Sequence, residues 1–184
     1  MTCMTLPLRA RSLIDFWISA GPQAWFAKDL AFDAEFRQRF MDDHMAGARR
    51  QLDGWMASAH GALALLLLLD QFPRNAFRDT AHMFATDSLA LHFAEQSVER
   101  GDISAIDKEL RVFLILPFEH SENLQHQEMA VRLCQDLDSR TLQFAVMHRD
   151  IIVEFGRFPH RNEMLGRVTT DAEREFLASG GFRG

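Results

Sequence analysis

An uninterrupted apolar run at residues 62–69 constrains this chain more than any other feature of its sequence. The run reads Ala-Leu-Ala-Leu-Leu-Leu-Leu-Leu and is followed at once by Asp70. Leucine is a strong helix former and the run has no β-branched residue, so the pattern favours a helix over a strand. The run is apolar on every face, which predicts the most buried helix of the protein. It is far shorter than the roughly 20 apolar residues that a membrane-spanning helix needs.

Apolar residues at helical spacing predict helices along most of the chain. Phe32, Phe36 and Phe40 recur every four residues and mark one face of a long helix. Further helices are predicted near residues 9–18, 89–98, 106–114, 130–137 and 144–155. No segment alternates apolar and polar residues over a useful length, as a half-buried strand would. We therefore expect an all-α single domain, residues 1–184, in which about eight helices with short connections pack as antiparallel pairs.

Capping residues and prolines predict where several helices begin and end. Ser58 stands just before the helix that contains the apolar run, where its hydroxyl can cap the first turn. Thr170 and Glu173 have the spacing of a capping box at the start of a short C-terminal helix. Pro73 and Pro117 are predicted to stop helices, because proline lacks the backbone N–H that a helix needs.

The charge balance and the cysteine content exclude several classes of protein. The net charge is −6 and the isoelectric point is near 5.7, so the chain lacks the basic footprint of a nucleic-acid binder. Two cysteines, Cys3 and Cys134, are too few for a disulfide framework, and there is no CxxC motif for zinc or redox chemistry. Residues 1–12 contain no apolar segment of the signal-peptide type. We expect a cytoplasmic protein with no membrane or nucleic-acid partner and no cofactor.

Polar side chains that are costly to bury gather in four patches at the ends of predicted helices. The patches are residues 70–75, 86–87, 119–122 and 148–162. Helix capping accounts for the second patch, and it also accounts for Ser121 and Glu122 as the start of a helix. Capping does not account for Glu119 or His120, which are left as candidates for a functional site.

Two of these patches contain nearly the same string. Phe-Pro-Arg-Asn occupies residues 72–75, and Phe-Pro-His-Arg-Asn occupies residues 158–162. One explanation is structural, because proline can halt a helix and asparagine can cap the next one. The other is functional, with the two turns directing Arg74 and Arg161 toward one shared pocket. The competing outcome is that each arginine pairs with a local carboxylate, Arg74 with Asp70 and Arg161 with Asp150 or Glu154.

The candidate site residues come from these patches. The ligand-binding candidates are Arg74, Asn75, Arg157, Arg161 and Asn162. A guanidinium group matches two oxygens of a carboxylate or phosphate, and amides add donors. The acid–base candidates are Glu119, His120, His148, Asp150 and His160. Histidine suits that role because it titrates near neutral pH, although a histidine on an apolar helix face is also explained as a core residue.

No signature motif identifies a reaction. The chain lacks a P-loop, a GxGxxG fingerprint, a GxSxG elbow and an HExxH motif. Neither Glu119-His120 nor His148-x-Asp150 has strong metal-ligand spacing, so we expect no bound metal. Cys134 lies on an apolar helical stripe, which makes it a poor candidate for a nucleophile.

Several strings together resemble one bacterial family, the domain-of-unknown-function family 924. They occupy residues 13–17, 25–26, 62–75, 84–87, 116–122, 148–152 and 155–162. The two Phe-Pro strings are the most specific, and the resemblance extends over about residues 13–177. It implies a tetratricopeptide-repeat-like helical fold and a cytoplasmic bacterial protein, and it brings no assigned activity. The chain shows no internal period near 34 residues, so the repeat-like description rests on the resemblance alone.

Three hypotheses for the function follow from the sequence. The first is a binding module that holds an anionic small molecule or peptide with its arginines and histidines. The second is a hydrolase that uses a histidine and a carboxylate of the same pocket as acid and base. The third is that the polar patches are structural ion pairs that tie helix ends together. A carboxylate within hydrogen-bond reach of a histidine would favour the enzyme.

Overall fold

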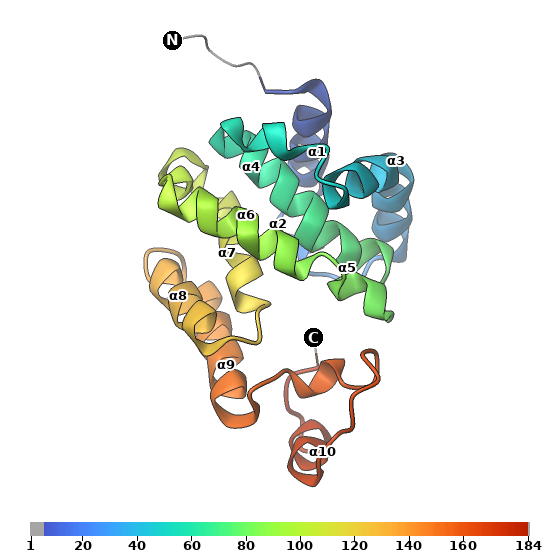
Figure 1. Ribbon diagram of the computed structural model, residues 1–184, viewed down its shortest axis with the longest axis vertical. Coiled ribbons are helices and arrows are strands. Elements are labelled where there is room, and N and C mark those ends of the chain that lie inside the picture. Colours follow the sequence, from blue (N-terminus) through green and yellow to red (C-terminus); the bar gives the residue numbers. More distant parts are fainter. Residues whose placement is uncertain (1–5, 184) are drawn as a thin grey trace. The chain divides into compact units, whose positions relative to one another are not determined.

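The computed structural model describes residues 6–183, and within them every regular element is helical (Figure 1). This confirms the predicted all-α fold. The described residues contain ten α-helices, labelled α1 to α10, where the sequence predicted about eight; the additional helices are short. They divide into two compact units: unit 1 comprises residues 6–78 and 82–117, and unit 2 comprises residues 79–81 and 118–183. The single domain spanning 1–184 and its tetratricopeptide-like character stay predictions.

Unit 1 is built around the apolar run. Its helices are α1 (Leu8–Ala20), α2 (Pro22–Trp25), α3 (Leu30–Ala48), α4 (Ala59–Leu66), α5 (Phe72–Ala76), α6 (Asp87–Glu99) and most of α7 (Val112–Glu119). The short η1 (Asp53–Ala57), η3 (Ala81–Phe84), η4 (Asp102–Ala105) and η5 (Lys108–Leu110) connect them. Helix α4 packs against α1 and α6 (Figure 1). Every side chain of residues 62–69 is 0% exposed, which confirms that this helix is the centre of the core.

The helix of the apolar run continues through Pro73, so the predicted stop at this proline is wrong. Between α4 and α5 the turn widens into a π-helical segment, η2 (Leu67–Gln71), in which the N–H of Phe72 donates to the carbonyl of Leu67. A proline can be accommodated in this way because the wider turn does not require its missing N–H. Pro117 likewise lies inside α7, which ends two residues later than the sequence predicted.

The carbonyl groups near the π-helical segment receive hydrogen bonds from side chains. Nδ1 of His44 on α3 lies 2.8 Å from the oxygen of Leu68. The hydroxyl of Thr86 donates to the oxygen of Leu69, the next carbonyl along the chain. Thr86 precedes α6 without capping it by its side chain, because its hydroxyl is used here instead. Buried carbonyls need such donors, so this segment depends on α3 and on the start of α6.

The predicted capping residues have mixed outcomes. Ser58 accepts the N–H of Gly61, and Thr170 forms the full capping box with Glu173, as expected. The prediction that Ser121 starts a helix is wrong. That helix begins three residues later behind Asn123, and the Ser121 hydroxyl lies 2.8 Å from Nδ1 of His126 instead.

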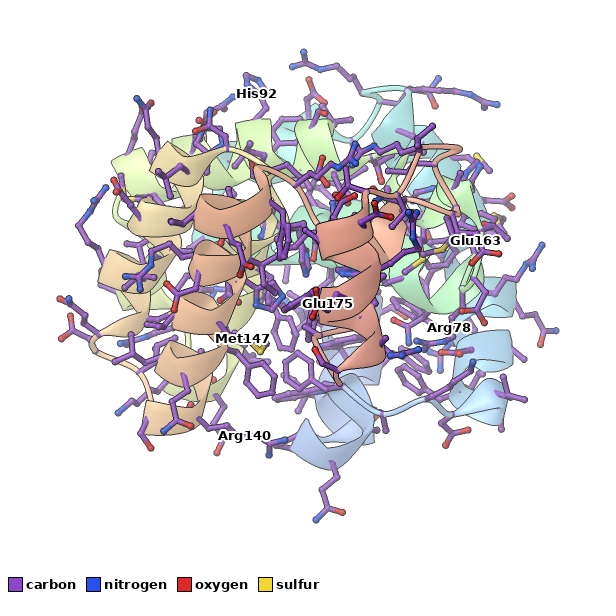
Figure 2. The ribbon with its side chains drawn as sticks, turned by 90° about the horizontal axis from the view of Figure 1, so that it is seen from below. Arg78, His92, Arg140, Met147, Glu163 and Glu175 are labelled. Atoms are coloured by element: carbon purple, nitrogen blue, oxygen red, sulfur yellow. The ribbon has the colours of Figure 1, made fainter. Side chains whose placement is uncertain are left out.

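Unit 2 contains α8 (Leu124–Cys134), α9 (Ser139–Phe155), the short η6 (Pro159–Arg161) and α10 (Asp171–Ala178). Helices α8 and α9 lie side by side and form a hairpin (Figure 1). Gly156 adopts a left-handed conformation with φ of 68°, which ends α9 and leads into the second Phe-Pro turn. The apolar core of this unit consists of Ile151, Ile152 and Phe158, with Met147, Phe155, Phe176 and Phe182 packed against it. Figure 2 shows Met147 on α9, with phenyl rings between that helix and α10.

None of the helices among residues 6–183 is long and apolar enough to cross a membrane.

Candidate functional site

Arg74 of the first Phe-Pro string, which is helical and lies in α5, is bound by two carboxylates of unit 1. Its guanidinium donates to both oxygens of Asp87, at 2.8 and 3.0 Å, and lies 3.3 Å from Oδ1 of Asp70. Burial opposes the charge, but Asp70 and Asp87 together raise the pKa of Arg74 above its ordinary value. Arg74 thus pairs with Asp70 of its own patch, as the alternative explanation expected, and also with Asp87 of the second patch. The structure also corrects the explanation of Asp87 as a helix cap alone, because both of its carboxylate oxygens accept hydrogen bonds from Arg74.

Asn75 and the neighbouring Arg78 both bind one carboxylate on α3. Nδ2 of Asn75 donates to Asp33 Oδ1 at 2.7 Å, and Arg78 donates to both oxygens of Asp33 at 2.9 and 3.0 Å. These contacts join α3 to the end of α5. The first Phe-Pro string is thus engaged in contacts that hold helices together, and we leave Arg74 and Asn75 out of the proposed site.

Arg157 and Asn162 contact the first turn of α10 and the residues just before it. Arg157 donates to both oxygens of Glu173, at 2.6 and 2.8 Å, and to the carbonyl of Val168 at 2.8 Å. The hydrogen bonds from Arg157 lower the pKa of Glu173 to about 2. The buried Asn162 has its Nδ2 3.5 Å from the hydroxyl of Thr169. Both candidates therefore support the loop between η6 and α10.

Asp150 lies on the exposed side of α9. It accepts a hydrogen bond at 2.9 Å from its neighbour Arg149, which is also partly exposed. The sequence grouped Asp150 with His148 and His160, but the structure gives it a surface ion pair.

Four rings in unit 2 form a closed cluster, which we call the ring cluster: His148, Phe158, His160 and Phe182. Each ring contacts the next. The centroids are 5.6 Å apart for His148 and Phe158, 5.6 Å for Phe158 and His160, 5.2 Å for His160 and Phe182, and 4.7 Å for Phe182 and His148. The guanidinium carbon of Arg161 lies 4.5 Å from the centroid of the Phe158 ring, as in a cation–π contact. Two predicted histidines and one predicted arginine therefore meet around the second Phe-Pro turn.

His148 is oriented by a backbone carbonyl and approached by a carboxylate. Its Nδ1 lies 2.8 Å from the oxygen of Phe144 and 3.7 Å from Oε2 of Glu119. A carbonyl oxygen only accepts, so Nδ1 carries the hydrogen. Glu119 is 2% exposed, and its other oxygen accepts from the thiol of Cys134 at 3.6 Å. Burial, reinforced by this carboxylate, raises the pKa of the Cys134 thiol well above its ordinary value, which makes it a poor nucleophile.

His160 sits in a dry and electropositive environment. Burial is the main cause that lowers its pKa to about 3; the positive charge of Arg161 and the neighbouring His148 and His120 add to the effect, and the Glu122 carboxylate opposes it. Nδ1 of His160 is buried, and no hydrogen-bond partner for it is found within residues 6–183. At neutral pH this imidazole is therefore uncharged and holds a buried polar atom that a ligand could satisfy.

Glu122 fixes the second Phe-Pro turn against the start of unit 2. One of its oxygens accepts the backbone N–H of Phe158 at 2.9 Å and the guanidinium of Arg167 at 2.8 Å. Burial opposes the charge of Glu122, but Arg167, the Phe158 N–H and Arg161 together lower its pKa. The sequence assigned Glu122 to a helix start and did not identify Arg167.

Phe182 was also missed by the sequence analysis. It follows two glycines after the last helix, a context that gives no signal for a site.

Cys3 lies outside the described residues. Within residues 6–183 no group of three or more histidine, cysteine, aspartate or glutamate side chains is placed to hold a metal ion. Arg74 belongs to unit 1 and Arg161 to unit 2, and the shared pocket expected from the two turns stays a prediction.

An open hollow of about 420 Å³ lies elsewhere, on unit 1, and contains none of the predicted site residues. It is lined by Leu8, Arg11, Ser12, Asp15, Phe16, Ser19 and Arg39. Arg39 is already engaged there, because it pairs with Glu35 at 3.1 Å and stacks over the Phe16 ring at 4.6 Å. The ring cluster remains the better candidate, since it combines histidines, an arginine and a buried unsatisfied atom.

Comparisons with known proteins agree with the resemblance described above. A model of the family described as "Bacterial protein of unknown function (DUF924)" matches residues 13–181. A solved structure of a protein of unknown function from Agrobacterium tumefaciens is 54% identical in sequence and superimposes with a TM-score of 0.91. The match covers 93% of this chain and 97% of that one. No curated protein matches the chain.

Proposed function

Because the chain belongs to the bacterial family DUF924, whose description states no activity, we propose a function from the site itself: unit 2 binds an anionic small molecule or peptide at the ring cluster. The observation that carries the proposal is the convergence of His148 and His160 with Arg161 around the second Phe-Pro turn. An anion placed there would meet the planar fork of Arg161, which suits carboxylate and phosphate.

The state of His160 supports an anionic rather than a cationic ligand. Its low pKa reflects burial and the positive charge of Arg161, so a further positive charge beside it is unfavourable. An anion would offset that charge and stabilise the protonated imidazole. Binding would therefore raise the pKa of His160, which is a direct signature of occupancy at this site.

The test is a titration of the protein with propionate and with inorganic phosphate, followed by the NMR signals of the histidine rings. We expect the His160 signal to move on binding and its pKa to rise. Arg161→Lys keeps the charge but loses the fork, and it should weaken binding about tenfold, which is about 1.4 kcal/mol. Arg149→Ala, which removes an arginine that is paired on the surface of the same unit, is the matched control and should bind as the parent does. The proposal fails if neither anion moves the histidine signals, or if both variants weaken binding equally.

One observation favours the hydrolase as a second candidate. Nδ1 of His148 donates to the Phe144 carbonyl and lies 3.7 Å from the Glu119 carboxylate, an arrangement that fixes the tautomer and the orientation of the imidazole. His148 would then act as general base through Nε2. Hydrolysis of p-nitrophenyl acetate or p-nitrophenyl phosphate above the buffer rate, lost in His148→Gln and reduced in Glu119→Gln, would support an enzyme. Equal rates in all three proteins would exclude these ester classes.

A further inference from the structure

The Phe182 side chain, which comes from the segment after α10, inserts its ring between two histidines of the ring cluster. Its ring lies between two imidazoles, with interplanar angles of 67° to His148 and 88° to His160. Edge-to-face pairs at centroid separations of 4.7 and 5.2 Å are favourable aromatic contacts. The position between the two histidines is therefore suited to an aryl ring.

The chain after α10 turns sharply to bring Phe182 there. Gly180 has φ of 92°, in the region that favours glycine. A Cβ at Gly181 would lie 2.6 Å from atoms of Phe176, including its backbone oxygen, so only glycine fits this close approach. The turn is thus specified by its sequence and returns the next residue to the ring cluster.

The hydrogen bonds of this segment within the described chain go to α10 and not to the ring cluster. Gly181 donates its N–H to Phe176 at 2.9 Å, Ser179 donates its hydroxyl to the same carbonyl at 3.0 Å, and Arg183 donates to the carbonyl of Leu177 at 2.7 Å. Phe182 itself meets the cluster through ring packing. Another aryl ring could therefore replace it without the loss of a hydrogen bond to α9 or to η6.

Building on the proposed function, we propose that the ligand is an aryl carboxylate and that Phe182 is its internal competitor. The aryl ring takes the place of the Phe182 ring between His148 and His160, and the carboxylate binds Arg161, which adjoins the same cluster through Phe158. The ring supplies apolar contact area and the carboxylate supplies orientation, the usual division of roles in a small-molecule site. Phe182 fills the site when no ligand is bound. The ligand can bind only those molecules in which Phe182 is undocked, so its apparent affinity is the intrinsic affinity multiplied by the undocked fraction.

The experiment compares 3-phenylpropionate with propionate, so that the aryl ring is the only difference between the probes. Dissociation constants are measured from the histidine NMR signals of the parent, of Phe182→Ala and of Arg183→Ala. We expect Phe182→Ala to bind 3-phenylpropionate about tenfold more tightly than the parent does, as for a site that is about 90% occupied by Phe182. Propionate should bind both proteins equally. Arg183→Ala, in the same segment, is the matched control and should behave as the parent.

A measurement on the parent protein covers the case in which Phe182→Ala fails to fold. The nuclear Overhauser effects between the Phe182 ring and the rings of His148 and His160 should disappear as 3-phenylpropionate saturates the site. If they persist at saturation, or if the aryl ring adds no affinity over propionate while propionate still binds, the inference is wrong and the proposed function stands. If neither probe binds any of the folded proteins, the inference is wrong, and if inorganic phosphate does not bind either, the proposed function is wrong as well.

Discussion

Arg74 illustrates how a single residue can hold three helical elements. It bridges Asp70, which is 1% exposed, and Asp87 at the start of α6. Breaking a buried ion pair leaves one charge unpaired in a poorly solvated place, which costs more than the pair contributed.

We therefore expect Arg74→Met to lower the free energy of unfolding by about 3–5 kcal/mol. Arg174→Met, which removes an exposed ion pair with Asp171, is the control and should cost about 0–1 kcal/mol. Urea unfolding followed by circular dichroism measures both. A loss in Arg74→Met as small as that of the control would mean that Asp70 and Asp87 do not need this arginine.

The Arg157–Glu173 pair predicts how stability changes at low pH. The pKa of Glu173 falls from about 4.5 to about 2 in the folded protein, chiefly because Arg157 donates hydrogen bonds to it. A depressed carboxyl pKa stabilises the fold above the unfolded value, and that contribution is lost as the pH falls from about 4.5 through 2. Glu173→Gln should therefore be less stable than the parent at pH 7, with a difference that shrinks toward pH 2. A difference that does not depend on pH would contradict this assignment.

Individual residues also show which parts of the candidate site could be predicted from the sequence and which could not. The arginines and histidines of the second Phe-Pro turn were identified because a repeated string drew attention to them. Asp70 was identified as a partner of Arg74. Asp87 and Glu173 were not linked to Arg74 and Arg157, because they are distant in sequence and each has a local explanation as a capping residue. A carboxylate at a helix start can serve a cap or an ion pair, and the choice depends on tertiary packing.

At the scale of elements, the helices were predictable and their ends at proline were not. The apolar stripes identified α3, α4, α6 and α9 because packing makes helical spacing visible in the sequence. Pro73 and Pro117 did not stop their helices. A widened turn with outside donors satisfies the carbonyls near Pro73, and those donors come from other elements that no local pattern reveals.

The π-helical segment should therefore depend on Thr86. Thr86→Val keeps the side-chain volume but removes the hydroxyl that donates to the Leu69 carbonyl. A buried carbonyl left without a donor should cost about 1–3 kcal/mol of unfolding free energy. Thr86→Ser retains the hydroxyl and should recover most of the loss. If Thr86→Val is as stable as the parent while Thr86→Ser is not, the methyl packing of Thr86 matters and its hydrogen bond does not.

At the scale of the whole molecule, the two units carry different spectroscopic probes. All three tryptophans, Trp17, Trp25 and Trp55, lie in unit 1, whereas His148 and His160 lie in unit 2. Tryptophan fluorescence therefore follows the unit that is built on the apolar run. The NMR signals of His148 and His160 follow the unit that contains the proposed site, so each unit can be observed separately.

Leu67 is the most direct test of the apolar run as the centre of unit 1. Its side chain is 0% exposed, at the point where α4 passes into the π-helical segment. Leu67→Asp would bury a carboxylate without a partner, a cost of several kcal/mol against a typical domain stability of about 5–15 kcal/mol. We expect the cooperative unfolding transition seen by tryptophan fluorescence to be lost. Leu30→Asp places the same charge at an exposed position in the first turn of α3, where the helix dipole favours it, and should leave that transition intact. A Leu67→Asp protein that still melts cooperatively would show that the run is not the centre on which unit 1 folds.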